Sequence, residues 1–302
     1  MKTQDGRETV LITGGTDGFG RATAVLLAEQ GYRVFAAGRS AERRAALEAY
    51  AQQGGLPIET VEMDVTDDTS VDRALDEVHM RAGPIDVLIN NAGIGIYAVV
   101  EEIKMPDWRR QLETNFFGII RVTQRVLPEM RARRRGRIVN MSSIAGKATL
   151  PLMGAYCASK HALEALSDAL RLEVAGFGIH VVVIEPGYIP TSFQPISREL
   201  STEYAARAAT SPYARVYQGF KKARDRSTQN VKDTPQDCAR VILRAIREKP
   251  PWPRYPVTRQ ARKVLFAKRF LSDRMLDGII LRRLGLAGRE AGSSEKGLKS
   301  RE

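Results

Sequence analysis

Tyr156 and Lys160 are four residues apart in the run AYCASKHALEALSDAL, whose leucines recur at spacings of three and four. This periodicity predicts an α-helix, on which residues four apart share one face. An ammonium about 4 Å from a phenolate would stabilise it by roughly 4 kcal/mol at an effective dielectric near 20, an upper bound because desolvation opposes it. We therefore expect the pair to lower the pKa of Tyr156 from about 10 toward neutrality and to act as a general acid and base.

A glycine-rich turn is the second chemical signal, and it is needed because a Tyr-x-x-x-Lys spacing alone also occurs by chance on solvated helices. The apolar run ETVLIT is followed by Gly14, Gly15, Gly18 and Gly20, and then by the helical run RATAVLLAEQG. Glycines let the backbone approach a pyrophosphate closely, and a helix N-terminus favours negative charge. A strand before the turn and a helix after it are the context that dinucleotide binding requires.

The elements that must position these residues are strands and helices in alternation. The predicted strands are ETVLIT, RVFAAG, IETVEM, IDVLIN, GRIVNM and IHVVVIEP, with a seventh in RYPV at 254–257. They are nearly continuous in apolar residues, as expected of strands buried on both faces. This order predicts an α/β fold with a doubly wound, about seven-stranded parallel sheet and helices on both faces.

One stretch, residues 188–233, interrupts the alternation and is called here the lid segment. Two helices are expected in it, around 199–209 and 212–226. Because it follows the carboxyl end of a strand, where open α/β sheets bind ligands, we interpret it as a substrate lid. A helical insert without a role in binding is the alternative. The aromatic and apolar residues in and near this segment favour an apolar substrate: Ile94, Ile96, Tyr97, Tyr188, Phe193, Tyr204, Tyr213, Tyr217 and Phe220.

Composition bounds the remaining options. The chain has 302 residues, 43% hydrophobic and 27% charged, as is ordinary for a globular protein. No run of 18 apolar residues and no signal peptide is recognised, so a cytoplasmic location is expected. Cys157 and Cys238 lack metal-ligand spacing, and we expect reduced thiols and no metal site.

The net charge of +12 is concentrated toward the C-terminus. We divide the chain into a domain at 1–257, a basic amphipathic helical extension at 258–288 and a disordered tail at 289–302. Within the extension, residues 259–284 interleave apolar and basic side chains. Such a helix can cover the pocket or an oligomer partner, or can contact a membrane peripherally. A solvated basic face is the simplest interpretation of the charge, and no nucleic-acid partner is expected.

In its motifs and their order, the chain resembles the short-chain dehydrogenase/reductase family. The resemblance extends from about Thr9 to Val257, most of the chain. Within this family, the chain resembles the members related to hydroxysteroid and retinol dehydrogenases. The matching segments are Thr13-Gly14-x-x-x-Gly18-x-Gly20, Asn90-Asn91-Ala92-Gly93, Asn115, Ser143 at 13 residues before Tyr156, and Pro186-Gly187 with Thr191. The resemblance implies a Rossmann fold and a homo-oligomer, either a dimer or a tetramer.

The resemblance also implies a catalytic role for four residues. Tyr156 would protonate a carbonyl oxygen in reduction or take the alcohol proton in oxidation. Lys160 would lower the pKa of Tyr156 and hold the nicotinamide ribose. Ser143 would polarise the substrate oxygen, and Asn115 would place a water that links Lys160 to solvent.

The cofactor expected from the resemblance is NADP(H). Gly38 occupies the position of the acidic residue that would bind the ribose of NAD, and Arg39 follows it with a guanidinium suited to a phosphate. Asp17 argues against NADP(H), because many NADP-using relatives carry a basic residue there. Asp64 is expected to border the adenine, although a turn-forming role is the alternative. The cofactor residues implied are Gly14, Thr16, Asp17, Gly18, Phe19, Gly20, Arg39, Asp64, Val65, Asn91, Ala92, Gly93, Tyr156, Lys160, Pro186, Gly187, Ile189 and Thr191.

The function expected is that of an NADP(H)-dependent oxidoreductase that transfers hydride between the nicotinamide and a ketone or secondary alcohol on a steroid-, retinoid- or lipid-like substrate. A cofactor-sensing regulatory protein on the same fold is one alternative, but such proteins usually lose the tyrosine or the lysine. A sugar-nucleotide epimerase-like enzyme is another, with a different glycine spacing and a longer C-terminal domain.

Overall fold

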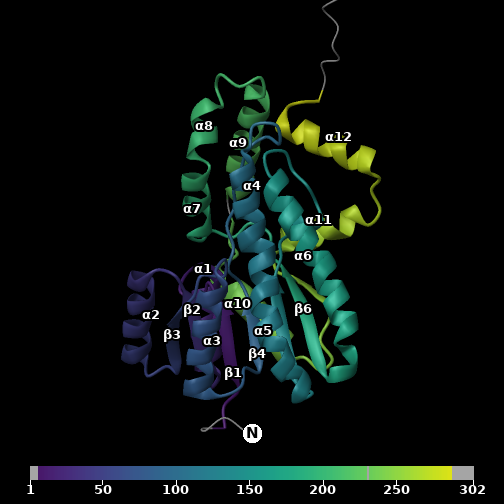
Figure 1. The fold of residues 1–302 in the computed structure, drawn as a ribbon. Coiled ribbons are helices and arrows are strands. Elements are labelled where there is room, and N and C mark those ends of the chain that lie inside the picture. Colours follow the sequence, from purple (N-terminus) through teal and green to yellow (C-terminus); the bar gives the residue numbers. More distant parts are fainter. Residues whose placement is uncertain (1–5, 230, 288–302) are drawn as a thin grey trace, which may run out of the picture.

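The computed structural model describes residues 6–229 and 231–287, which build a seven-stranded parallel sheet in the order β3-β2-β1-β4-β5-β6-β7 (Figure 1). The strands are β1 (Thr9–Thr13), β2 (Arg33–Gly38), β3 (Ile58–Glu62), β4 (Val87–Asn90), β5 (Gly136–Met141), β6 (Ile179–Glu185) and β7 (Arg254–Pro256). The central strands β1, β4 and β5 are buried along their whole length. The predicted doubly wound parallel sheet is therefore confirmed.

Successive residues of each strand point to opposite faces, and each face carries a layer of helices. In β1, Val10 and Ile12 belong to one apolar core, and Leu11 between them belongs to the other. The helices of the first layer are α1 (Gly18–Glu29), α2 (Ala41–Gly54) and α10 (Pro235–Arg247). Those of the second are α3 (Asp68–Ala82), α5 (Gly118–Ala132) and α6 (Gly154–Glu173). This two-sided burial explains the unbroken apolar runs in the strand sequences.

The strand order reverses at β1, which pairs with β2 on one side and β4 on the other. Thr13, at the carboxyl end of β1, is aligned with Ala37 of β2 and with Asn90 of β4. The connections leaving β1 and β4 therefore run to different sides of the sheet and leave a crevice between them. The glycine turn and the loop that begins at Asn91 both open into this crevice.

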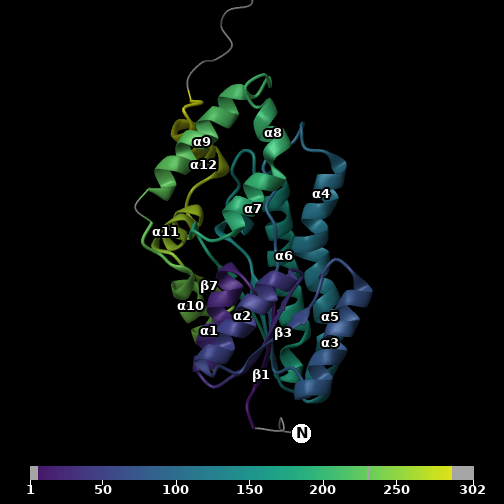
Figure 2. The same ribbon diagram turned by 90° about the vertical axis from the view of Figure 1, so that its left-hand side faces the viewer.

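The lid segment forms a helical cap beyond the carboxyl edge of the sheet, as Figures 1 and 2 show. It contains the three helices α7 (Phe193–Leu200), α8 (Thr202–Arg207) and α9 (Ala214–Thr228) where two were predicted. The missed helix α7 carries Pro195 in its first turn, a position where a missing N–H does not disrupt the helix.

Two helices follow the last strand, α11 (Arg259–Lys268) and α12 (Asp273–Leu284). Helix α12 packs on α9 of the lid segment, and Arg226 donates from Nη2 to the carbonyl oxygen of Arg283 at 2.9 Å. Gly219 permits this approach, because a Cβ at that position would collide with the carbonyl oxygen of Leu284. Among the described residues no helix is long and apolar enough to cross a bilayer. The tail predicted at 289–302 lies outside the described residues.

Candidate active site

Helix α6 carries Tyr156 and Lys160 on one buried face. Only 9% of Tyr156 and 5% of Lys160 is exposed to solvent. Lys160 donates from Nζ to the carbonyl oxygen of Met141 at 2.7 Å, at the end of β5. The same nitrogen lies 5.9 Å from the centroid of the Tyr156 ring. The spacing in the sequence thus brings the two groups together beside the carboxyl edge of the sheet.

The protonation of Tyr156 differs from the sequence expectation. Burial raises the pKa of Tyr156 to about 12, and a side-chain hydrogen bond with Ser143 opposes this rise. Burial likewise lowers the pKa of Lys160 to about 8, while the negative charge of Glu164 opposes that change. Desolvation is the largest cause of both shifts, and the ammonium is held by a backbone carbonyl. Tyr156 is consequently a neutral phenol at neutral pH, which is the form that a general acid requires.

Ser143 reaches the same edge from the end of β5. Its backbone is extended, and its Oγ accepts from the backbone N–H of Ala145 at 3.1 Å, which caps the short 3₁₀ turn Ile144–Gly146. The turn places the hydroxyl beside the phenol of Tyr156, as their side-chain hydrogen bond shows. Two polar donors thus converge where a substrate oxygen could lie.

Asn115 occupies a π-helical turn, Glu113–Phe117, between α4 (Met105–Leu112) and α5. Its fully buried amide accepts from the N–H of Ile94 at 2.8 Å and donates to the carbonyl oxygen of Ile94 at 2.9 Å. It also donates to Ser159 Oγ at 3.1 Å. Asn115 therefore ties the loop after β4 to the helix that carries Tyr156 and Lys160, and π-helical turns frequently mark functional sites.

Two further buried polar residues support this loop: Thr13, which begins the glycine motif quoted from the sequence, and Gln111, which was missed. Gln111 accepts from the N–H of Ile96 at 2.8 Å and donates to the carbonyl oxygen of Ile94 at 2.7 Å. Thr13 accepts through Oγ1 from the N–H groups of Asn91 and Ala92 at 3.0 and 3.1 Å. The position of Thr13, a polar residue at the end of a buried strand, was the signal in the sequence for its supporting role.

The glycine turn forms a cradle with no room for side chains. A Cβ at Gly20 would collide with the carbonyl oxygen of Gly14, and Gly14 and Gly18 have φ values of +60° and +52°. Asn91 donates from Nδ2 to the carbonyl oxygen of Gly14 at 2.9 Å and joins the cradle to β4. Thr191 lies 3.5 Å from the Cβ position of Gly18, so the segment after β6 faces the turn. This geometry fits a dinucleotide pyrophosphate.

Asp17 and Phe19 occupy the remaining positions of the turn. Asp17 caps α1 by accepting from the N–H of Gly18 at 2.7 Å, and its second oxygen pairs with Arg43 Nη1 at 2.9 Å. Phe19 is partly buried and packs against the apolar core of the first helical layer. The carboxylate of Asp17 is therefore partly neutralised by an arginine that the sequence did not single out.

The end of β2 carries the features expected to distinguish the two cofactors. A Cβ at Gly38 would lie 2.7 Å from Thr16 Oγ1, so a side chain at this position would require Thr16 to shift. Arg39 follows and is 65% exposed at its side chain. Arg44 donates to the carbonyl oxygens of Gly38 and Arg39 at 2.8 and 2.9 Å and fixes the course of the chain.

Asp64 and Val65 follow β3 on the adjacent side. Asp64 accepts from the N–H and Oγ1 of Thr66 at 2.9 and 2.7 Å, and lies 3.4 Å from Arg39 Nη1. Although burial raises its pKa, these hydrogen bonds and Arg39 hold it below the ordinary value. Asp64 thus forms the turn that was the alternative interpretation, and it also contacts Arg39. Val65 packs on Gly118.

The segment after β6 completes the crevice. Gly187 approaches Thr258 so closely that a Cβ would collide with its Oγ1, and Ile189 is buried. The N–H of Thr191 donates to Gln194 Oε1 at 2.8 Å, and Thr191 Oγ1 accepts from the N–H of Phe193 at 3.2 Å. These bonds connect Pro186-Gly187 directly to the start of the lid segment.

Aromatic side chains enclose Tyr156. The ring centroids of Tyr97 and Phe193 lie 6.2 and 5.9 Å from that of Tyr156, and Phe220 of α9 lies 6.5 Å from Tyr97. Burial raises the pKa of Tyr97. Residues of the loop after β4 and of two lid helices therefore form an apolar surface around the phenol.

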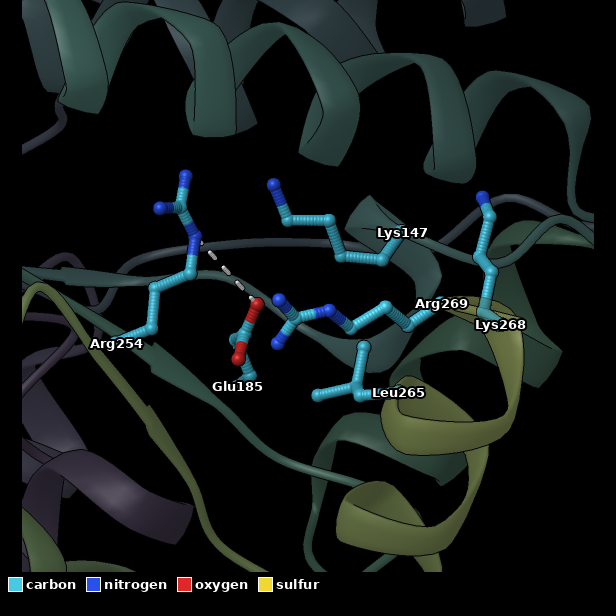
Figure 3. Close-up of a pocket in the computed structure, with 6 residues that line it drawn as sticks. All are labelled: Lys147, Glu185, Arg254, Leu265, Lys268 and Arg269. Carbon is cyan, nitrogen blue, oxygen red and sulfur yellow. Dashed lines mark ion pairs between the residues drawn. The ribbon is translucent and has the colours of Figure 1, made fainter.

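A cavity of about 320 Å³ lies beside the ends of β6 and β7, and Figure 3 shows the residues that line it. Glu185, the last residue of β6, lines it together with the basic residues Lys147, Arg254, Lys268 and Arg269. The side chain of Glu185 is 3% exposed and 3.9 Å from Arg254 Nε. Burial raises the pKa of Glu185 to about 7, and the negative charge of Glu164 adds to the effect.

Comparison with known proteins agrees with this geometry. A family model described as short chain dehydrogenase matches residues 8–201. The chain is 40% identical over 186 residues to 3-ketodihydrosphingosine reductase of Bacteroides thetaiotaomicron, covering 62% of this chain and 65% of that protein. It is 34% identical over 249 residues to retinol dehydrogenase 8 of Bos taurus, covering 80% of this chain and 78% of that protein.

Solved structures show the same fold with either cofactor. Actinorhodin polyketide ketoreductase with NADPH superposes with a TM-score of 0.68 at 32% identity, covering 80% of this chain and 91% of that one. A short-chain dehydrogenase/reductase from Burkholderia phymatum in complex with NAD superposes with a TM-score of 0.75 at 25% identity, covering 87% and 92%. The chain belongs to the short-chain dehydrogenase/reductase family, oxidoreductases of alcohol and carbonyl groups that bind NAD(P)(H).

Proposed function

We propose that this protein is an NADP(H)-dependent carbonyl reductase, or the corresponding alcohol dehydrogenase, with Tyr156 as its general acid and base. The observation that carries the proposal is the buried, neutral phenol of Tyr156 beside Ser143 and Lys160. When bound, the nicotinamide supplies or accepts the hydride. The glycine cradle and the segment from Pro186 to Thr191 would hold the dinucleotide between them.

The side chains divide the proton chemistry among them. In reduction, Tyr156 Oη gives its proton to the substrate oxygen while Ser143 Oγ donates a hydrogen bond to the same oxygen. Lys160 provides a positive charge that stabilises the phenolate left behind. Asn115 holds the loop and α6 in register, and a water placed by it would return a proton toward Lys160. In oxidation the same atoms act in reverse.

Two observations favour NADP(H). Gly38 carries no carboxylate that would repel a 2′-phosphate, and Arg39 is exposed beside it. The pairing of Asp17 with Arg43 weakens the argument against NADP(H). Replacing Arg39 by Asp should raise the KM for NADPH about 10- to 100-fold and improve the use of NADH. Comparable catalytic efficiency of the unmodified protein with NADH and NADPH would contradict the assignment.

An apolar substrate is supported by the aromatic surface around Tyr156 and by the names of two relatives. Tyr97 and Phe193 pack against the ring of Tyr156, Phe220 lies beyond them against Tyr97, and Ile96 is fully buried in the same loop as Tyr97. Relatives named for a ketone of a long-chain base and for retinol match the chain at 40% and 34% identity. We therefore infer a steroid-, retinoid- or lipid-like ketone or secondary alcohol.

The proposal is tested with a panel of such ketones and alcohols, followed by the absorbance of NADPH. Replacing Tyr156 by Phe should lower turnover by about 10²- to 10⁴-fold, because the proton donor is removed, while NADPH still binds. Retained turnover in this variant would overturn the assignment of Tyr156. A protein that binds NADPH but turns over no member of the panel would instead favour a cofactor sensor. Interconversion of sugar nucleotides without net use of the cofactor would indicate an epimerase.

A homo-oligomer is also inferred. Met105 of α4 and Phe117 of the π-helical turn are 60% and 47% exposed. Apolar side chains exposed on neighbouring helices suit a self-contact. Light scattering after gel filtration should give a dimer or tetramer, and a monomer at micromolar concentration would contradict the inference.

A further inference from the structure

Two phenylalanines near the end of the chain are exposed to a degree that the fold does not explain. Phe266 and Phe270 are 69% and 68% exposed, and their ring centroids lie 5.1 Å apart. They therefore pack mainly on each other and present a small apolar surface to solvent. The pair belongs to α11 and the turn that follows it.

Cations surround this pair on the same side of the helix. Spacings of three and four place four exposed residues of α11 on one face, and Phe270 of the following turn lies beside them. These five residues are called here the α11 outer face: Arg259, Arg262, Lys263, Phe266 and Phe270. The opposite side of the helix carries Ala261, which is fully buried, and the partly buried Leu265. Helix α11 therefore packs on the protein through the side that carries Ala261 and Leu265, and its outer face is left exposed to solvent.

The three cations of the α11 outer face, Arg259, Arg262 and Lys263, have no carboxylate within ion-pair distance among the described residues. Several basic residues elsewhere on the surface do have such partners, as in the pairs Arg33–Glu59, Arg81–Glu77, Arg121–Asp68 and Arg125–Asp72. What distinguishes the α11 outer face is that its cations lie beside the exposed pair Phe266 and Phe270. The positive charge of this face is thus available to a partner outside the chain.

We propose that the α11 outer face binds the surface of a bilayer that contains anionic lipids. Aromatic side chains favour the boundary between headgroups and acyl chains, and lysine and arginine favour anionic headgroups. A second copy of the chain fits less well, because two such faces would bring like charges together. A nucleic acid would satisfy the cations but leave the packed phenylalanine pair in water.

The position of α11 connects this face to the lid segment. Helix α12 follows α11 after a short turn and packs on α9, as Figure 2 shows. A protein docked through α11 would keep the lid near the bilayer surface, where an apolar substrate is dissolved. Docking itself does not rest on the proposed reaction.

The experiment is flotation of the full chain with vesicles of phosphatidylcholine and with vesicles that also contain phosphatidylserine. Binding is expected to the anionic vesicles at low salt and should weaken as salt rises. Replacing both Phe266 and Phe270 by Ser should weaken binding about tenfold or more, since the apolar anchor is lost. The matched control replaces Met80 and Leu172 by Ser, which are 80% and 68% exposed on α3 and α6.

A second variant tests the contribution of the positive charges to vesicle binding. Replacing Arg262 and Lys263 by Gln should weaken binding to anionic vesicles about thirtyfold. The matched control replaces Arg73 and Arg131 by Gln, two exposed arginines on α3 and α5. Circular dichroism confirms that each variant is folded.

Four outcomes would overturn the proposal, and the first three concern vesicles and self-association. They are no binding to anionic vesicles at low salt, equal losses in the test and control variants, or a self-association that disappears when Phe266 and Phe270 are replaced. Preference for a DNA duplex over anionic vesicles would likewise reject it in favour of a nucleic-acid partner. Because the readout is affinity and not turnover, none of these outcomes bears on the proposed reductase.

Discussion

At the scale of single residues, Tyr156 shows that burial can control protonation more strongly than a neighbouring charge. Its phenol and the ammonium of Lys160 share a buried helix face, and both are shifted toward their neutral forms. The groups that cause this burial come from distant parts of the chain, among them Tyr97 and Phe193. Any charge placed next to Lys160 therefore matters for catalysis.

Glu164 is such a charge, one helical turn beyond Lys160. Its side chain is 4% exposed and lies 3.0 Å from both Lys147 Nζ and Arg254 Nε. Because its negative charge supports the ammonium of Lys160, replacing Glu164 by Gln should lower the pKa of Lys160 further below about 8. The alkaline fall in kcat/KM for ketone reduction should then move to lower pH.

The control for this prediction is Asp168→Asn, which also removes a partner of Arg254, at 2.6 Å, but lies another turn away. A pH profile of kcat/KM that moves equally in both variants, or in neither, would show that Glu164 does not act on Lys160.

The relative placement of the candidate catalytic residues could be predicted from the sequence, because residue type and spacing suffice to place groups on one helix face or at one sheet edge. Tyr156, Lys160 and Ser143 lie together as their spacing predicted. The direction of the pKa change was not readable, because it depends on how completely the lid segment covers the phenol. Gln111 and Arg43 were missed because their partners are distant in the sequence or unremarkable in type.

At the scale of elements, the contact between α9 and α12 determines how the lid segment is held. The two helices approach at Gly219, whose missing side chain leaves room for the carbonyl oxygen of Leu284. The existence of helices in both regions was predictable from periodicity. Their mutual packing was not, because it depends on one glycine and on backbone geometry.

Replacing Gly219 by Ala should separate α9 from α12. The added methyl group collides with backbone, and we expect a loss of about 1–3 kcal/mol in the free energy of unfolding. Since Phe220 next to it reaches the aromatic surface at Tyr97, the KM for an apolar ketone should rise while the KM for NADPH stays unchanged.

Gly278→Ala on α12 is the matched control, because its nearest neighbour, the flexible Arg282 side chain, lies 3.6 Å away. Alanine there should be neutral or should stabilise the helix by up to about 1 kcal/mol. Thermal unfolding and steady-state kinetics measure the stability and the KM values of both variants. Equal changes in the Gly219→Ala and Gly278→Ala variants would contradict the prediction that Gly219 is needed for the packing of α9 on α12.

At the scale of the whole molecule, strands from both halves of the sheet supply the groups that meet at its carboxyl edge. The strand order follows from the alternation of apolar runs and helices, which is why the sheet could be predicted. The cluster around Glu185 could not, since it joins β6, β7, α6 and α11 through contacts between residues up to 90 positions apart. This cluster couples the stability of the fold to pH.

Replacing Glu185 by Gln should stabilise the protein in alkaline solution. The pKa of Glu185 is raised from 4.5 to about 7, so the native state holds its proton more tightly than the unfolded chain does. The stabilising contribution of that proton is complete below about pH 4.5 and is lost as the pH rises through 7. Gln at position 185 carries no charge at any pH. At pH 8 the free energy of unfolding of the variant should therefore be about 1–3 kcal/mol higher than that of the unmodified protein.

The same comparison at pH 5 should show a much smaller difference, because Glu185 is then largely protonated. Glu29→Gln, an exposed carboxylate on α1, should leave the pH dependence unchanged. Urea unfolding at both pH values measures the effect. The opposite result, destabilisation of the Glu185→Gln variant at pH 8, would mean that the attraction of the Glu185 carboxylate to Arg254, 3.9 Å away, outweighs the cost of its desolvation. The fold would then require Glu185 in its charged form at the edge of this cavity.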